Sequence, residues 1–344
     1  MTVKKFTVIT MAAVCMITAA IISAKYLKNE QEMNLSVSDN IEEENNEPLP
    51  YIDQETQNLM IPLRRVIEQM GGKVEWNQNF DSIVISYKNT LLEIVLDGTE
   101  GTINGNPIVF TNSWINKNNI IYVSTDFMSD YFNTEIEWDG NIVGITSKSA
   151  GVEPPIIAFN AHENRGTINS YYVNIPVITG LVDRNYEKQL NMKFNTEIIE
   201  DVSAYSENAI EQYRNNPNSP ERSVDWKYIS KTMFRSPEFI SILSTSDETF
   251  LDSHIETSYE SINIDLQGQK EVSLMDMFKN DQFLEIYKEK YENMQINLET
   301  ANFYIKDGNM IIYMLDETGN LKEYVQDLNL LKKYLKNEYH VLIK

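Results

Sequence analysis

The stretch that decides the first half of the fold begins at Met60 and reads MIPLRRVIEQMGGKVEWN. A second stretch, YVSTDFMSDYFNTEIEWD, begins 62 residues later at Tyr122. The two stretches share apolar positions and a Glu-Trp pair: Ile61 matches Val123, Val66 matches Met128, Met70 matches Phe132, Val74 matches Ile136, and Glu75-Trp76 matches Glu137-Trp138. Self-similarity at one offset is the signature of a repeated structural unit. The chain therefore contains one small unit twice.

Each copy predicts a helix that lies on a β-hairpin. Pro62 suits the first position of a helix, where a missing N–H costs nothing, and Gly71-Gly72 suits its left-handed end. After the helix, Val74 and Trp76 share one face of a strand, because alternate side chains point the same way. We therefore expect an α+β fold for residues 51–147, in which the helix-on-hairpin unit is duplicated.

These residues resemble a known family. The run from Ile61 to Arg64, the run from Met70 to Asn77, and Ile103 to Pro107 (INGNP) between the copies are similar to the copper amine oxidase N-terminal-like domain. Such domains occur singly or in tandem on surface proteins of Gram-positive bacteria. The resemblance covers Tyr51 to Ser147. In the second copy Ser124 to Asp126 replaces Pro-Leu-Arg, and no glycine pair follows the helix.

The resemblance does not imply an oxidase. Amine oxidase chemistry needs a copper site of three His, two of them spaced His-x-His, and a Tyr in Thr-x-x-Asn-Tyr-Asp/Glu that becomes the quinone cofactor. The three His of this chain are His162, His254 and His340, and Asn185 to Glu187 has Val182 where the Thr is required. We therefore expect no cofactor and no metal. The resemblance implies the non-catalytic stalk alone.

The N-terminus predicts a membrane segment. Lys4 and Lys5 precede an uncharged stretch from Phe6 to Ala24. As a helix, this stretch would be roughly 28 Å long, close to the thickness of the hydrocarbon core of a bilayer. We expect residues 6–24 to be an uncleaved signal anchor. Cleavage after Ala24, which would make the protein secreted, is the alternative. In both cases the rest of the chain is extracytoplasmic.

The composition suits a Gram-positive cell surface. Cys15 is the only cysteine among 344 residues and lies in the apolar stretch, so the exported part has no disulfide. The net charge is −22, and so acidic a surface repels nucleic acid and anionic wall polymers. We expect no nucleic-acid partner. The same charge attracts basic proteins, of which lysozyme is an example.

Two linkers divide the chain. Residues 25–50 carry two Lys against seven acidic residues and end with Pro48 and Pro50, a composition that favours an extended, disordered segment. A second linker ends at Pro154-Pro155. The predicted organisation is a signal peptide or anchor at 1–24, an acidic linker at 25–50, the duplicated domain at 51–147, a linker at 148–155 and a separate α+β domain at 156–344.

The last of these domains has its own pattern. An apolar strand from Tyr171 to Ile178 is stopped by Gly180, and from Asp183 to Tyr213 apolar residues recur at every fourth position, as on one face of a helix. Further strands are predicted at Trp226–Phe234, Phe239–Ser244, Glu256–Leu266, Phe303–Ile305 and Met310–Met314. Further helices are predicted at Leu274–Phe278, Gln282–Asn293 and Val325–Lys336.

This half resembles a second group of domains. The run from Tyr172 to Leu181, followed by Leu190-Asn191, is similar to the opening of a domain found ahead of the catalytic part of certain peptidoglycan deacetylases. The run Ile262 to Leu266, then Gly268 and VSLMDMF from Val272, is similar to the domain that usually follows it. The two together form the extracytoplasmic part of lysozyme-sensing anti-sigma factors. The resemblance extends over this whole half.

The chain departs from that family at two turns. A Gly-Gly-Ala-His-Gly turn is replaced by Leu251 to Ile255, which keeps only the His, and the aromatic, proline-containing close is replaced by the charged stretch 316–326. There is no spaced His pair for a deacetylase metal, no Gly-x-Ser-x-Gly elbow and no P-loop. We expect the protein not to be an enzyme. Asp252 and His254 remain as a candidate titratable pair, with a solvated turn as the alternative.

Four other residues are candidate binding residues. Trp76 and Trp138 could stack on sugar rings, although matching Trp residues of a duplicated hairpin are more often part of the core. Arg64 and Arg65 could bind a wall carboxylate, although Arg residues at a helix start are more often solvated. The residues themselves leave these alternatives open.

Two functions from different classes remain. In the first, the protein is a membrane-tethered or secreted surface module that binds cell-wall glycan or a secreted protein. In the second, it is a decoy, an inhibitor or a sensor ectodomain for a basic protein such as lysozyme. A sensor that holds a sigma factor needs an inner domain, and we expect only Met1 to Lys5 to lie inside. An enzyme with an unrecognised site is the third possibility.

Overall fold

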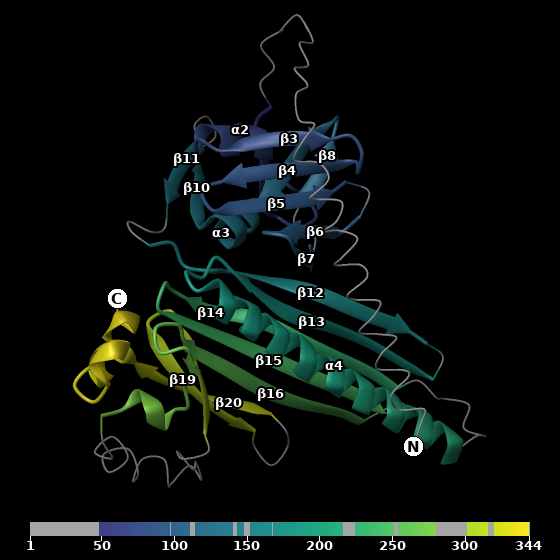
Figure 1. Ribbon diagram of the computed structural model, residues 1–344, viewed down its shortest axis with the longest axis vertical. Helices are drawn as coiled ribbons and strands as arrows, with labels where there is room; N and C mark the ends of the chain where they lie inside the picture. The colour runs from purple at the N-terminus through teal and green to yellow at the C-terminus, as the bar shows by residue number, and fades with distance from the viewer. Residues whose placement is uncertain are drawn as a thin grey trace, which may run out of the picture. The chain divides into compact units, whose positions relative to one another are not determined.

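The computed structural model describes residues 48–343, except 97, 111–113, 140–142, 148–151, 167, 216–223, 251–253, 280–300 and 316–319 (Figure 1). The expected membrane segment, nearly all of the acidic linker and the expected helix Gln282–Asn293 lie outside the described residues. Among the residues that are described, no helix is both long and apolar enough to cross a bilayer. The described part is rich in sheet with several helices, so the α+β class is confirmed at this level.

The chain divides into two compact units. The first consists of the residues up to Pro107 together with Asn112–Ser124, and the second of Ile108–Thr111 together with Thr125–Lys344. The elements that begin in the first unit are β1 (Tyr51–Ile52), β2 (Leu59–Pro62), α2 (Leu63–Gln69), β3 (Lys73–Asn77), β4 (Ser82–Tyr87), β5 (Thr90–Val95), β6 (Glu100–Ile103), β7 (Asn106–Val109), β8 (Trp114–Lys117) and β9 (Ile120–Ser124). They form two sheets, in the orders β3-β4-β5-β6-β7 and β1-β2-β9-β8.

Two glycines end the first helix. Pro62 is the last residue of β2, so α2 begins one residue later than the sequence predicts. Gly71 has φ +84°, the left-handed conformation that stops a helix. Gly72 is required for space, because a Cβ there would lie 2.8 Å from Cγ2 of Ile67 and 2.9 Å from the carbonyl oxygen of Ser86. The glycine pair therefore lets the chain turn from α2 directly into β3.

The second copy of the repeat makes the same turn without glycine. It comprises α3 (Thr125–Phe132), β10 (Thr134–Trp138) and β11 (Val143–Ser147). Asn133 stands 62 residues after Gly71 and adopts φ +50°. Asn tolerates this region better than most non-glycine residues, because its short polar side chain can hydrogen-bond locally. Asn133 thus takes the place of the first glycine at the turn between α3 and β10.

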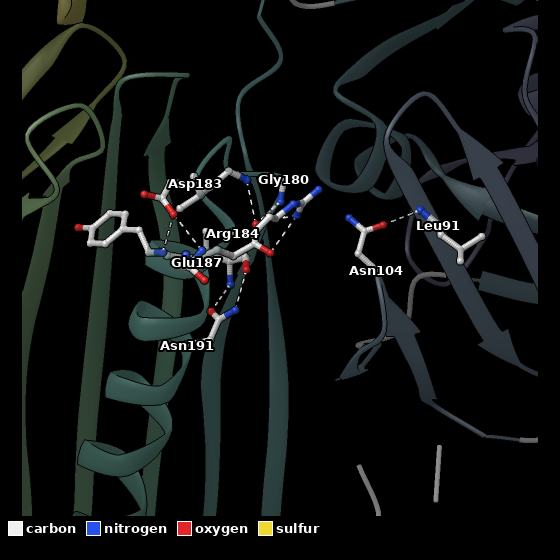
Figure 2. A network of polar contacts seen from close by, with 11 residues as sticks. Leu91, Asn104, Gly180, Asp183, Arg184, Glu187 and Asn191 are labelled. Carbon is white, nitrogen blue, oxygen red and sulfur yellow. Dashed lines mark hydrogen bonds and ion pairs between the residues drawn. The ribbon is translucent and has the colours of Figure 1, made fainter. Parts of the chain in front are cut away.

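A turn in the first unit carries part of the family-like sequence. Asn104 and Gly105 both have positive φ, of +48° and +82°, as the two central residues of a type I′ turn require. The side-chain oxygen of Asn104 accepts a hydrogen bond from the N–H of Leu91 at 2.8 Å (Figure 2). The INGNP run is therefore explained as a turn whose first residue also braces the neighbouring strand.

A six-stranded sheet forms the centre of the second half of the chain. Its strands are β12 (Ile156–Arg165), β13 (Asn169–Thr179), β14 (Val224–Arg235), β15 (Phe239–Phe250), β16 (His254–Asp265) and β17 (Lys270–Glu271), in this order. Neighbours are antiparallel except β13 and β14, which are parallel and are joined by the helix α4 (Arg184–Asn215). The sequence predicted the helix and four of the strands but missed β12 and the two-residue strand β17.

The helix α4 covers one face of this sheet (Figure 1). Its residues Leu190, Phe194, Ile198 and Val202, four apart, are all at most 5 % exposed. They pack in one cluster with sheet residues such as Val173, Ile240 and Ile264. Burial of an apolar side chain contributes roughly 1.5–3 kcal/mol, so this stripe is the main reason that α4 stays on the sheet.

The C-terminal part of the chain packs against the face of the large sheet that α4 does not cover. It contains η1 (Met275–Met277), β18 (Asn302–Lys306), β19 (Asn309–Leu315), β20 (Leu321–Asp327), α6 (Leu328–Leu331) and η2 (Asn337–Leu342). The predicted hairpin about Asp307-Gly308 is confirmed, with φ +49° and +76° at these residues. The predicted helix Val325–Lys336 is wrong, because the first part of this stretch pairs with β19 as a strand. Only the four residues of α6 are helical there, and the carboxylate of Asp327 caps them.

A half-buried arginine joins α3 to the large sheet within the second unit. The guanidinium of Arg235, in β14, donates to the carbonyl oxygens of Ser129 and Asp130 at the end of α3 and to that of Pro155. Burial lowers the pKa of Arg235, while the carboxylates of Asp130 and Glu153 oppose that shift. A cation at the carbonyl end of a helix also interacts favourably with the helix dipole.

A polar network closes the connection between β13 and α4 (Figure 2). One carboxylate oxygen of Glu187 accepts the N–H groups of Gly180 at 2.8 Å and Leu181 at 2.9 Å. The guanidinium of Arg184 reaches the same carboxylate at 2.9 Å. Asn191 then pairs with both backbone groups of Ile178, each at 2.8 Å, so its side chain replaces a neighbouring strand. The network satisfies backbone groups that the sheet leaves unpaired.

We predict that Asn191→Ala destabilises the protein by about 2–4 kcal/mol, because it leaves a buried N–H and a buried C=O without partners. Asn195→Ala is the matched control, since Asn195 is exposed on the same helix. This control should change the free energy of unfolding by less than about 0.5 kcal/mol. Urea unfolding of both variants measures the difference. Equal effects would show that the pairing with Ile178 contributes nothing particular.

Candidate functional site

The two candidate tryptophans differ in their surroundings. Trp76 lies at the end of β3, opposite Ile83 on β4, and is 52 % exposed, so it is not part of the core. Trp138 ends β10 opposite Val143 and is half-buried. Its indole N–H is buried and has no hydrogen-bond partner among the described residues. The two residues belong to different compact units.

The candidate arginines and the candidate titratable pair also differ in their surroundings. Arg64 is exposed, but it donates to the carbonyl oxygen of Val74 at 2.8 Å and pairs with Glu68 at 3.5 Å, so it braces α2 on β3. Arg65 is half-buried on the same helix. Asp252 lies outside the described residues. His254 is the first residue of β16, in register with Phe250, and its side chain is outside the description.

A different site emerges on the face of the large sheet that α4 does not cover. Strand register aligns Glu163 of β12, Tyr172 of β13, Lys227 of β14, Asp247 of β15 and Thr257 of β16. Because side chains of register partners point to the same side, the five form a row across five strands. We call this the first row. It offers two carboxylates, an ammonium group and two hydroxyl groups.

A second row runs beside the first. Its members are Arg165, Ser170, Asp225 and Thr249, aligned in the same way across β12 to β15. All members of the two rows except Thr257 line a groove of about 660 Å³. We refer to the two rows and this groove as the open face.

Contacts within the open face hold its polar groups in position. Arg165 pairs with Glu163 of the first row at 3.1 Å. The hydroxyl of Ser170 donates to the carboxylate of Asp225, across the parallel strand pair. The hydroxyl of Thr257 donates to the carboxylate of Asp247 at 2.8 Å. These exposed contacts are each worth less than about 1 kcal/mol.

The floor of the groove is rigid. Trp226 directs its indole to the α4 side, where its ring lies 5.2 Å from that of Tyr205 and its N–H donates to Ser246 at 2.6 Å. Tyr171 is also packed against the α4 cluster, and its burial raises the pKa of its hydroxyl. The aromatic ring that the open face offers to a ligand is therefore that of Tyr172.

The rest of the same sheet face is occupied. Tyr304, Ile311 and Tyr313 of β18 and β19 form a buried cluster. Met233, Leu243 and Tyr259 of the large sheet pack against them. The three-stranded sheet of β18, β19 and β20, which we call the small sheet, thus covers one part of this face. The open face is the remaining part, near the end of β15 and the start of β16. This division was not foreseen, because it depends on where β18 and β19 pack.

The open face can form hydrogen bonds and ion pairs with a ligand. Among the residues that the structure describes, no group of three His, Cys, Asp or Glu side chains could hold a metal ion.

Sequence reasoning missed Glu163 and Arg165, because it missed β12. It noted Tyr172 only as part of a family-like run. The apolar run Ile156–Phe159, directly after Pro154-Pro155, was the signal that could have located this strand.

A family model agrees with the sequence resemblance of the first half. Residues 39–146 match the model of the copper amine oxidase N-terminal domain, which confirms the resemblance of the first half. Among solved structures, a DUF3298 family member from Bacteroides fragilis NCTC 9343 has 13 % identity and a TM-score of 0.43, and the match covers 55 % of this chain and 97 % of that one. A DUF3298 family protein from Pseudomonas aeruginosa PAO1 has 15 % identity and a TM-score of 0.37, with 56 % and 96 % covered. No curated protein matches the chain.

We predict that Trp76 dominates the quencher-accessible fluorescence, because it is the exposed one of the four tryptophans. Trp114 and Trp138 are half-buried, and Trp226 is buried. Trp76→Phe should remove most of the emission that acrylamide quenches. Trp138→Phe, the matched change at the equivalent position of the second repeat, should leave that emission largely in place. Stern–Volmer plots of both variants measure the accessible fractions. If the two variants lose equal fractions, Trp76 does not lie exposed in solution.

Proposed function

We propose that this protein is a non-catalytic, extracytoplasmic binding protein of the cell surface, and that its open face binds cell-wall glycan. The observation that supports this most directly is the groove lined by the two polar rows. It combines one available aromatic ring, that of Tyr172, with the carboxylates of Asp225 and Asp247 and the ammonium group of Lys227. Concave sites with a few fixed polar groups are the usual form of a ligand site.

A glycan suits this chemistry. Sugar rings have apolar faces that pack on aromatic rings, and hydroxyl groups that both donate and accept hydrogen bonds. The carboxylates accept hydrogen bonds from such hydroxyls, and Lys227 donates to them. Because the strands hold these groups at fixed spacing, little conformational entropy is lost when a ligand binds.

The proposed location follows from the N-terminal sequence. The uncharged stretch from Phe6 to Ala24 would anchor the chain in the membrane, or release it if cleaved. The acidic residues between Lys25 and Pro50 would then hold the folded part away from the bilayer. The match of residues 39–146 to the stalk domain of amine oxidases supports a spacer role for the first half.

The test is co-sedimentation of the full chain, in a nonionic detergent, with insoluble peptidoglycan stripped of anionic polymers. Stripping is needed because a chain of net charge −22 is repelled by anionic polymers whatever its specificity. The proposal expects pelleting that persists in moderate salt. Protein that remains in the supernatant at all salt concentrations would contradict it.

Variants of the first row make this test specific. We predict that Tyr172→Thr and Lys227→Met each weaken retention about tenfold, which corresponds to about 1.4 kcal/mol. Thr is chosen because its β-branched side chain suits a strand. Lys306→Met is the matched control, because Lys306 is exposed on β18 in the small sheet. It should pellet like the unchanged protein. Equal retention of all three variants would place binding elsewhere.

A basic secreted protein such as lysozyme is the second candidate partner. The net charge of −22 favours it, because an acidic field steers cationic proteins toward the surface. In this reading the protein acts as a decoy, an inhibitor or the ectodomain of a sensor. Gel filtration of the full chain with lysozyme tests it. A complex that survives moderate salt supports this candidate, and two separate peaks count against it.

A further inference from the structure

The first row crosses the large sheet from one edge to the other. It starts with Glu163 on β12, the strand at one edge of the sheet, and it ends with Thr257 on β16. The last strand, β17, pairs only with Ile264 and Asp265 of β16. Among the described residues, no strand therefore pairs with the outer side of β16 at Thr257. Within this part of the chain, the first row reaches a sheet edge at both ends.

The direction along the strands is closed at one end. Toward the small sheet, the same face carries Tyr259, two residues after Thr257, and Leu243, four residues before Asp247. Tyr259 and Leu243 both pack against the buried cluster of the small sheet. At about 3.3 Å per residue, the small sheet is reached within about 13 Å of the first row. A long, unbranched ligand therefore has more room across the strands than along them.

The strands also set the spacing of the first row. Neighbouring strands of a sheet lie about 4.8 Å apart, so the five side chains of the row extend over about 19 Å. In an extended β-1,4-linked sugar chain, each ring advances the chain by nearly the same step. Such a chain, laid along the first row, therefore places one ring over each strand.

Each strand offers its ring a different group. Tyr172 on β13 supplies an aromatic ring on which a sugar packs. Lys227 on β14 donates hydrogen bonds to sugar hydroxyls, and Asp247 on β15 accepts them. The carboxylate of Glu163 stands at one end of the row, and the hydroxyl of Thr257 stands at the other, just beyond the groove. Because Tyr172 and Lys227 lie on neighbouring strands, a disaccharide that uses both covers only β13 and β14.

We propose that the open face binds the interior of a long, extended β-1,4-linked glycan chain, which lies across the sheet with one sugar ring over each strand of the first row. This inference rests on the proposed glycan-binding function, and it adds the direction and the length of the ligand. Because the row reaches a sheet edge at both ends, the glycan continues beyond the site on either side. The site therefore does not require a chain end.

The test is calorimetric titration of the full chain with peptide-free peptidoglycan glycan of two, four, six and eight sugars. The buffer contains moderate salt and a nonionic detergent whose head group is not a sugar, and ligand-observed NMR measures the weakest binding. We expect the affinity to rise about tenfold or more from two sugars to six, because further strands are contacted. From six sugars to eight it should change less than about twofold, because the row has no further strand.

The outcomes separate this inference from the proposed function. Equal affinities for two and six sugars would overturn the inference and leave glycan binding in place. A further rise of about tenfold from six sugars to eight would overturn the length given by the five strands. No binding at any length, together with no pelleting on peptidoglycan, would contradict the proposed function and this inference with it.

A variant at the end of the row tests the direction of the glycan. Thr257 lies on the third strand after that of Tyr172, so a disaccharide held at Tyr172 and Lys227 does not reach it. Thr257→Val should weaken the six-sugar chain about threefold and leave the disaccharide unchanged, whereas Lys227→Met should weaken both. Normal binding of the disaccharide also shows that Thr257→Val is folded. If Thr257→Val weakens both lengths equally or neither of them, the glycan does not lie along the row.

Ser258→Ala is the matched control for Thr257→Val. Ser258 is the next residue of β16 and is exposed, but it points to the opposite side of the sheet. The variant also loses one hydroxyl, and it should bind every length like the unchanged protein. A loss equal to that of Thr257→Val would overturn the assignment of Thr257 to the site.

The end of the glycan gives an independent test. Borohydride reduction of the eight-sugar chain opens its terminal ring and leaves seven intact rings, which is more than five strands require. We expect the reduced chain to bind like the unreduced one. A marked loss of affinity on reduction would show that the site holds a chain end, which would overturn the inference.

Discussion

The backbone at the end of β13 must find hydrogen-bond partners where the sheet provides none, and the C-terminal fold depends on how this is done. Asn191 pairs with both backbone groups of Ile178, and Glu187 accepts the N–H groups of Gly180 and Leu181. Both side chains belong to the first turns of α4. The same residues that satisfy the strand therefore fix where the helix begins, and its apolar stripe then covers one face of the sheet.

A second buried polar junction fixes the small sheet on the other side. The hydroxyl of Ser241 donates to the side-chain oxygen of Asn263 at 2.7 Å, and both residues are buried. Asn263 in turn donates to the carbonyl oxygen of Phe303, and the N–H of Ile305 donates to Ser241. These bonds occupy the edge of β18 that β19 does not pair with. A buried group of this network that lost its partner would be costly, so the network fixes where the small sheet packs on the large sheet. The open face is the part of the large sheet that the small sheet leaves uncovered.

Local patterns predicted the elements that local forces decide. The repeat at an offset of 62, the stripe along α4 and the Asp307-Gly308 hairpin were all readable, because periodicity and turn chemistry act within a few residues. The stretch from Val325 looked helical because Leu328, Leu331 and Leu335 are spaced three and four apart. Pairing of Tyr324 and Gln326 with β19 overrode that pattern. All three leucines are buried nonetheless, in the cluster beneath the small sheet.

The candidate site was harder to predict than the fold. Its first row takes one residue from each of five strands, and no spacing in the sequence reveals such a register. Trp76 and Arg64, which do stand out in the sequence, lie in the first unit, where Arg64 braces the fold.

The central claim is that the open face of the large sheet is the binding surface. Hydrogen–deuterium exchange of the full chain, with and without soluble peptidoglycan fragments, tests it most directly, because exchange reports each segment separately. The account predicts slower exchange in peptides that cover residues 161–173 and 225–229 when the fragments are present. Slower exchange confined to residues 51–147, or no change anywhere, would contradict it.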